Sequence, residues 1–189
     1  MRNLINKVRI ISNLVIVSDK TLFMSQLEQA QSEYQGFLEE FKSIIISTVS
    51  EQGLPNASYA PFVKDELKNI YIYVSGLSTH TKNIYANPHV SVLLIEDESQ
   101  SNQVFARRRL NFDCTATLIE RETEEWNKIV EQFQERFGQI IEVLRDLNDF
   151  RIFQLTPYEG RFVIGFGAAY HISGNNLDQL VQITGETKG

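Results

Sequence analysis

The stretch IYIYVSGLSTHTKNIYANPHVSVLLIE, residues 70–96, predicts a strand, a polar turn, a short helix and a second strand. It opens by alternating isoleucine or valine with tyrosine or serine, which is the period-two pattern of a strand whose two faces meet different surroundings. Ser78 or Thr79 then suits the N-cap of the helix. The Asn-Pro pair at 87–88 ends that helix, because a residue before proline is driven out of the helical region. The apolar run at 90–95 predicts a buried strand.

Groups able to bind an anion gather where this short helix begins. The free backbone N–H groups of a helix start can combine with nearby hydroxyls and a lysine, and such a combination suits a phosphate. The residues that would contribute are Ser75, Ser78, His80, Thr81 and Lys82. An ordinary polar connection between two strands has the same composition, and the pattern alone leaves both interpretations open.

Length, charge and cysteine content narrow the classes of protein. A chain of 189 residues fits one domain with a proper core. Its net charge of -6 argues against a nucleic-acid partner, which needs a basic face. Cys114 is the single cysteine, which fits a reducing, cytoplasmic location, and we expect it to be a strand residue and not a nucleophile. The three histidines lack zinc-ligand spacing.

Residues 1–23 differ in their sequence pattern from the rest of the chain. Basic residues precede a short apolar run, but this run is interrupted by Ser12 and Asn13, and it is too short to span a membrane. We expect 1–23 to be an extension outside the folded domain, 24–172 to be the domain, and 173–189 to be a tail with a short helical turn.

The remaining elements follow from periodicity and turn residues. Helical spacing of apolar residues predicts helices, alternation predicts strands, and clusters of glycine and proline predict turns. The predicted helices are a first one from Ser25, one from Thr123 to Phe137 and a second short one to Leu147; the predicted strands are 44–49, 56–63, 105–120, 150–155 and 161–172, with a turn at 157–160. In the strand that starts at 105, we expect Arg107 and Arg109 to point to one face and Arg108 to the other.

Three stretches together carry a family resemblance. They are HTKN followed by ANP and an apolar strand, FARRRLNF at 105–112, and FRIFQLTPYEGRFVIGFGAAY at 150–170. In this order and spacing they resemble the flavin-mononucleotide (FMN)-binding split-barrel superfamily that includes pyridoxamine 5'-phosphate oxidase, and more narrowly its haem-utilisation (HugZ/HutZ-like) branch. The resemblance covers roughly residues 26–180.

This resemblance implies a fold, a cofactor and an assembly. The fold would be mainly β: a six-stranded antiparallel split β-barrel with flanking helices. The protein would be a homodimer that binds FMN, as a flavoprotein, or haem at the subunit interface. The resemblance places Ser75, Ser78, His80, Thr81 and Lys82 around the cofactor phosphate. It adds Ser58 and Tyr59 as contacts of the ring. It also places Arg107 and Arg109 near a phosphate or a haem propionate. A solvated strand end explains these two arginines equally well.

Two departures from the family pattern bear on activity. Pyridoxamine 5'-phosphate oxidases place an Arg-Lys pair where this chain has Thr79-His80, so the resemblance favours the haem branch. That branch implies a histidine ligand to iron from the C-terminal segment, and the tail after Ser173 contains none. His171 is the remaining C-terminal candidate for the haem iron, with a structural strand histidine as the alternative. A haem-degrading oxidoreductase and a non-catalytic cofactor carrier therefore both stay open.

Overall fold

The computed structural model describes residues 27–174 and 176–184, so the predicted extension at 1–23 lies outside the described residues. The chain divides after Phe37 into two units. In the first unit, residues 27–37 form a helix, as predicted. The second unit starts at Leu38 and holds all the strands. Among the described residues, no helix is long and apolar enough to cross a membrane.

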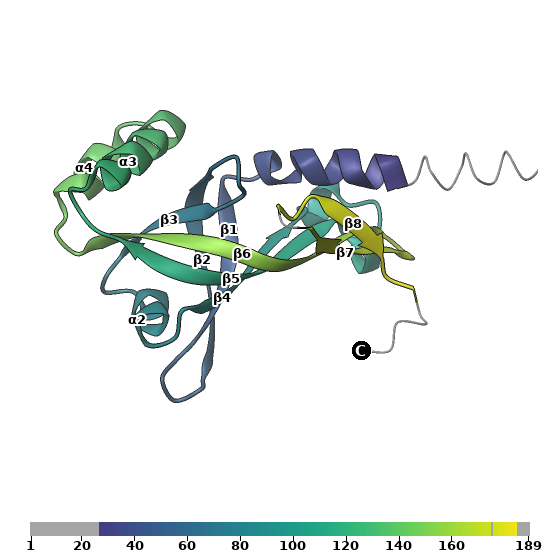
Figure 1. Ribbon diagram of the computed structural model, residues 1–189, viewed down its shortest axis with the longest axis horizontal. Helices are drawn as coiled ribbons and strands as arrows, with labels where there is room; N and C mark the ends of the chain where they lie inside the picture. The colour runs from purple at the N-terminus through teal and green to yellow at the C-terminus, as the bar shows by residue number, and fades with distance from the viewer. Residues whose placement is uncertain (1–26, 175, 185–189) are drawn as a thin grey trace, which may run out of the picture. The chain divides into compact units, whose positions relative to one another are not determined.

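Six antiparallel strands form a closed barrel (Figure 1). They are β1 (Ser43–Val49), β2 (Pro55–Lys64), β3 (Ile70–Ser75), β4 (His89–Ile95), β5 (Arg109–Ile119) and β6 (Phe150–Gly165). Their order is β3-β2-β1-β4-β5-β6, and pairing of β3 with the first part of β6 closes the barrel. The second part of β6 pairs with β7 (Ala168–Ser173), which pairs with β8 (Gln179–Gln182). The six-stranded antiparallel barrel with flanking helices is thus confirmed.

The helices of this unit precede the first strand or lie in the connections between strands. They are the 3-10 turns η1 (Leu38–Glu40), η2 (Glu98–Gln100) and η3 (Val104–Ala106), and the helices α2 (Thr79–Ala86), α3 (Glu124–Phe137) and α4 (Ile140–Asp146). α3 begins where Thr123 accepts a hydrogen bond from the backbone of Trp126. It ends at Gly138, whose positive φ of 76° suits a residue without a side chain.

Residues 70–75 form strand β3, as predicted, and both faces of this strand are buried. Ile70 and Ile72 are fully buried, while Tyr71 and Tyr73 belong to a second apolar cluster with Trp126 and other residues of α3. The aromatic residues of α3, namely Trp126, Phe133 and Phe137, are therefore part of the core of this chain. Burying each of its large side chains stabilises the fold by about 1.5–3 kcal/mol.

Two predictions for the C-terminal third were wrong. Pro157–Gly160 is no turn: β6 runs through it, and a shift of register between Asp113 and Cys114 of β5 absorbs the irregularity. The chain reverses instead at Gly167, which has φ 67°. Within residues 176–184 the tail forms a strand and no helical turn, and Leu177, which has a positive φ, precedes β8.

Candidate functional site

Helix α2 packs against β1 and β2. Its N-cap is Ser78, and it ends at Asn87, directly before Pro88, as predicted. Asn83 is buried and donates a 3.0 Å hydrogen bond to the hydroxyl of Thr48, an inward-facing residue of β1. The ring of Tyr85 lies edge-on against Phe153 of β6. These contacts fix the helix and hold the candidate residues that it carries.

His80 and Ser58 are brought together by this packing. The Nδ1 atom of His80 and the hydroxyl of Ser58 share a hydrogen bond of 2.9 Å. Only 8% of His80 is exposed, and its Nε2 atom has no hydrogen-bond partner within residues 27–174 and 176–184. Burial lowers the pKa of His80 below its ordinary value, so the imidazole is neutral near pH 7. A neutral His80 supplies no positive charge to a phosphate.

Ser75 and Thr81 use their hydroxyls inside the protein. Ser75 donates to Asp149 Oδ2 at 2.6 Å and accepts from the backbone N–H of Leu77 at 3.1 Å. Thr81 donates to the backbone oxygen of Ser75 at 2.7 Å. Sequence reasoning missed Asp149, because only the pairing of Ser75 with Phe150 brings it to this position. Its carboxylate lies beside the start of α2, where its negative charge would repel a bound phosphate.

Ser78 and Lys82 are the remaining polar candidates on this helix. Ser78 makes no side-chain cap hydrogen bond, and Lys82 is exposed. Of the five residues predicted to hold a phosphate, these two therefore have side chains best able to meet an anion from solution.

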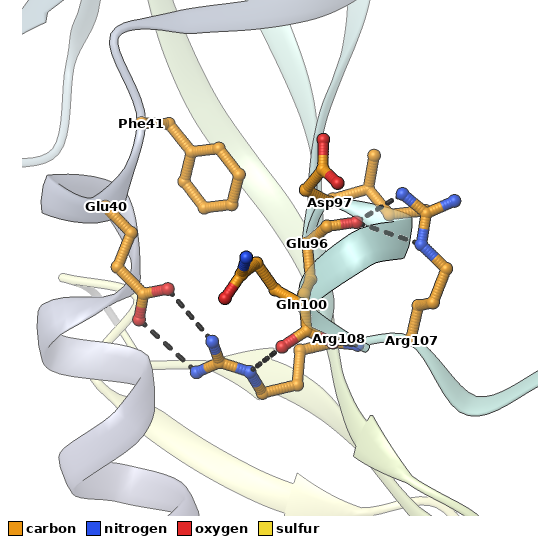
Figure 2. Close-up of a pocket in the computed structure, with 8 residues that line it drawn as sticks. Glu40, Phe41, Glu96, Asp97, Gln100, Arg107 and Arg108 are labelled. Carbon is orange, nitrogen blue, oxygen red and sulfur yellow. Dashed lines mark hydrogen bonds and ion pairs between the residues drawn. The ribbon is translucent and has the colours of Figure 1, made fainter. Parts of the chain in front are cut away.

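Arg107 and Arg108 lie elsewhere, at a pocket of about 580 Å³ (Figure 2). The lining residues are Glu40, Phe41, Ile95, Glu96, Asp97, Gln100, Arg107 and Arg108. Arg107 donates to the backbone oxygen of Glu96 at 2.9 Å and to the Glu98 carboxylate at 3.1 Å. Arg108 bridges Glu96, at 2.9 Å, and Glu40, at 3.0 Å. Both guanidinium groups are therefore already neutralised by carboxylates or bound to backbone.

The predicted start of this strand at 105 was wrong. Val104–Ala106 form η3, Arg107 caps it, and the strand begins only at Arg109. Arg109 donates to the backbone oxygen of Arg107 at 3.1 Å. Arg108, which sequence reasoning did not select, forms ion pairs with Glu40 and Glu96. The acidic loop before the three consecutive arginines was the sequence signal that could have indicated these ion pairs.

Within one subunit, the start of α2 and the arginines are far apart. Ser75, just before the start of α2, pairs with Phe150, the first residue of β6, whereas Arg109 pairs with Val163 near the other end of that strand. Most of the length of β6 therefore lies between them. One chain therefore does not join these two groups into a single anion site.

Tyr59 and His171 are on the outer surface of the sheet. Tyr59 is 68% exposed, although the adjacent Ser58 faces α2. His171 lies on β7 with its side chain 44% exposed, and its Nδ1 atom is 3.8 Å from a carboxylate oxygen of Glu159. The candidate residues thus occupy three places: α2, the arginine pocket and the outer face.

Cys114 lies at none of these three places. It lies on β5 with no exposed surface, as predicted for a strand residue. Burial raises the pKa of its thiol to about 12, so the reactive thiolate does not form near neutral pH.

Together, the barrel closed by β3 and β6, the helix packed on β1 and β2, and the helical pair after β5 define a split-barrel protein. Residues 30–164 match the pyridoxamine 5'-phosphate oxidase family. The chain belongs to this family.

A curated relative of the chain is named as a haem oxygenase. The chain is 43% identical to the haem oxygenase HutZ of Vibrio cholerae over 153 residues, which are 81% of this chain and 86% of HutZ. The crystal structure of V. cholerae HutZ, there called a haem storage protein, superposes with a TM-score of 0.68 at 40% identity and covers 71% of this chain and 96% of HutZ. Campylobacter jejuni ChuZ superposes with a TM-score of 0.74 at 33% identity, over 82% of this chain and 63% of ChuZ.

Proposed function

We propose that this protein binds haem and degrades it as an oxidoreductase of the HutZ type. The observation that carries the proposal is the 43% identity to a haem oxygenase over most of both chains. The shared split-barrel fold supports it. In this proposal haem is the substrate, and the reaction also consumes dioxygen and electrons from an external donor.

Haem suits the side chains better than FMN does. At the start of α2, the hydroxyls of Ser75 and Thr81 are already engaged and the Asp149 carboxylate lies close by, which disfavours a phosphate. A neutral imidazole is a common ligand of haem iron. His80 has an Nε2 atom without a partner among the described residues, and His171 has an accessible imidazole. The donor set therefore fits haem, with FMN as the second candidate.

We also propose that the protein is a homodimer with the ligand at the subunit interface. Ile45 and Tyr59 are paired on β1 and β2, and both are exposed on the outer face. Exposed apolar neighbours on a sheet are typical of an interface. Ser78, Lys82 and Arg109 would then meet the ligand's carboxylates, whereas Ser58, Ser75 and Thr81 would position α2 and His80. Arg107 would not touch the ligand but would hold the loop that contains Glu96 and Glu98 in place.

When bound, haem would supply the iron that activates dioxygen. The protein would bind the ring, orient it and exclude water. A carrier without turnover is the alternative function, and the description of V. cholerae HutZ as a haem storage protein favours it. With its single cysteine buried, we expect the protein to work in the cytoplasm.

The test is to load the purified protein with ferric haem and to add ascorbate under air, with catalase present to remove free peroxide. For an enzyme, the Soret band should disappear over successive scans and iron should be released. A carrier would keep its Soret band under the same conditions. A protein whose spectrum does not change when haem is added would refute haem binding altogether.

A further inference from the structure

The space of the pocket in Figure 2 is not used by the haem function proposed above. Its volume of about 580 Å³ lies in the range of pockets that hold small organic molecules. Three segments enclose it: η1 with Phe41, the end of β4 with η2, and the arginines that precede β5. The salt bridges of Arg108 to Glu40 at 3.0 Å and to Glu96 at 2.9 Å tie these three segments together. The pocket is therefore built into the fold.

The two arginines of this pocket do not offer a site for an anion. Arg107 donates to a backbone oxygen at 2.9 Å and to the Glu98 carboxylate at 3.1 Å, and Arg108 is held by its two salt bridges. The lining residues carry three carboxylates against two guanidinium groups. Asp97 is the carboxylate that no basic side chain binds within residues 27–174 and 176–184. The surplus charge of the pocket is therefore negative, which favours a cation as the ligand.

Asp97 and Gln100 supply the hydrogen-bond acceptors for such a cation. Asp97 accepts from the backbone N–H of Ser99 at 2.8 Å, and a carboxylate has room for further donors. The hydrogen bonds from Ser99 hold the pKa of Asp97 below its ordinary value, so this group is ionised at neutral pH. The Oε1 atom of Gln100 accepts no hydrogen bond from the part of the chain that the structure describes. Both side chains can therefore accept from a ligand.

Phe41 and Ile95 give the pocket an apolar wall. Figure 2 shows the ring of Phe41 and the side chain of Gln100 pointing into the same space. Arg136 of α3 donates to the backbone oxygen of Phe41, which anchors this wall to the helix. The face of an aromatic ring attracts a cation, as a carboxylate does. The wall therefore suits a ligand that joins a positive charge to an apolar body.

We propose that this pocket is a second ligand site, which binds a small organic amine in its ammonium form. Asp97 would bind the charged nitrogen, Gln100 would accept one of its hydrogens, and Phe41 and Ile95 would cover the carbon body. An ammonium group has three donors and no acceptor, which matches the acceptors of Asp97 and Gln100. A carboxylate or a phosphate would meet arginines that are already bound. The proposal does not depend on haem binding.

Calorimetric titration of the full chain at low salt tests the charge of the ligand, with benzylammonium as the probe. Benzyl alcohol is the neutral analogue of similar size, and benzoate is the anionic one. Benzylammonium should bind saturably, benzyl alcohol at least fivefold more weakly, and benzoate not at all. Added salt should weaken the binding of benzylammonium, because it screens the charge of the pocket. Absence of benzylammonium binding, or tighter binding of either analogue, would overturn the proposal and leave the haem function intact.

Asp97→Asn tests where the ammonium binds. The amide oxygen can still accept from Ser99, but the charge is lost, so benzylammonium should bind about fivefold more weakly, as expected for an exposed ion pair. Benzyl alcohol should bind to this variant and to the wild type equally well. Glu51→Gln, in the exposed turn between β1 and β2, removes the same charge outside the pocket and is the matched control. Equal affinity of benzylammonium for Asp97→Asn and Glu51→Gln would overturn the assignment to this pocket.

Discussion

Adjacent residues of β2 point to opposite faces of the sheet, so the candidate side chains Ser58 and Tyr59 lie on different surfaces. Ser58 faces α2 and bonds His80, while Tyr59 points outward beside Ile45. The alternation of a strand makes this separation predictable once the strand is known. The partner of Ser58 was not predictable, because it depends on how α2 packs against the barrel. The same holds for Asp149, which reaches Ser75 only through the closure of β3 on β6.

Ser58→Ala should destabilise the protein. It removes the hydrogen bond to His80 Nδ1 and leaves a buried ring nitrogen unsatisfied, at a cost of about 1–3 kcal/mol. Urea denaturation measures this free energy of unfolding. Ser47→Ala, at an exposed position of β1, is the matched control and should stay within about 0.5 kcal/mol of the wild type. Equal effects of the two changes would show that the bond contributes nothing.

His80 should make the fold sensitive to mild acid. Burial lowers its pKa in the folded state below 6.5, so below pH 6.5 the unfolded chain binds a proton that the folded chain does not. The free energy of unfolding should therefore fall with decreasing pH, by up to about 1.4 kcal/mol per pH unit from this group, until the folded-state pKa is reached. His80→Gln should have a flatter profile between pH 6.5 and 5. Parallel profiles would contradict a buried neutral imidazole.

At the scale of elements, the first two thirds of the barrel could be predicted closely and the last third less well. β3, α2 and the capped start of α3 carry strong local signals, namely alternation, a proline stop and Thr123. β6 was predicted as two strands, because Pro157 and Gly160 are turn residues in most settings. A long neighbouring strand, β5, overrides these local preferences by pairing along the whole length.

Gly160 is required by packing and not by backbone conformation. A Cβ atom there would lie 2.7 Å from Ile172 Cδ1 and 2.8 Å from Phe112 Cδ1. Gly160→Ala should therefore cost about 1–3 kcal/mol in the free energy of unfolding. Gly165→Ala is the control on the same strand, since its Cβ would have no neighbour within 4 Å. Thermal unfolding of both variants checks this, and equal melting temperatures would contradict the close packing.

At the scale of the whole molecule, the family resemblance identified the barrel, but it did not locate the ligand. The residues expected at one site lie at three places of one chain, and most of the length of β6 separates two of them. A second subunit is the natural way to bring such places together, because a two-fold axis can bring the far end of one barrel to the near end of the other.

Ile45→Glu tests the proposed dimer. A charge at the centre of the apolar outer face should shift the protein from dimer to monomer in light scattering coupled to size-exclusion chromatography, because burying an unpaired carboxylate is costly. Leu67→Glu, in the exposed loop between β2 and β3, is the control and should leave the mass unchanged. A wild type that is monomeric at every concentration would exclude an interface site.

Haem binding itself is tested most directly by an absorption titration of the purified protein with ferric haem, run in parallel with FMN. The account predicts a saturable, stoichiometric shift of the Soret band with haem and no change in the flavin spectrum. Stoichiometric binding of FMN by a protein that leaves the haem spectrum unaltered would contradict it.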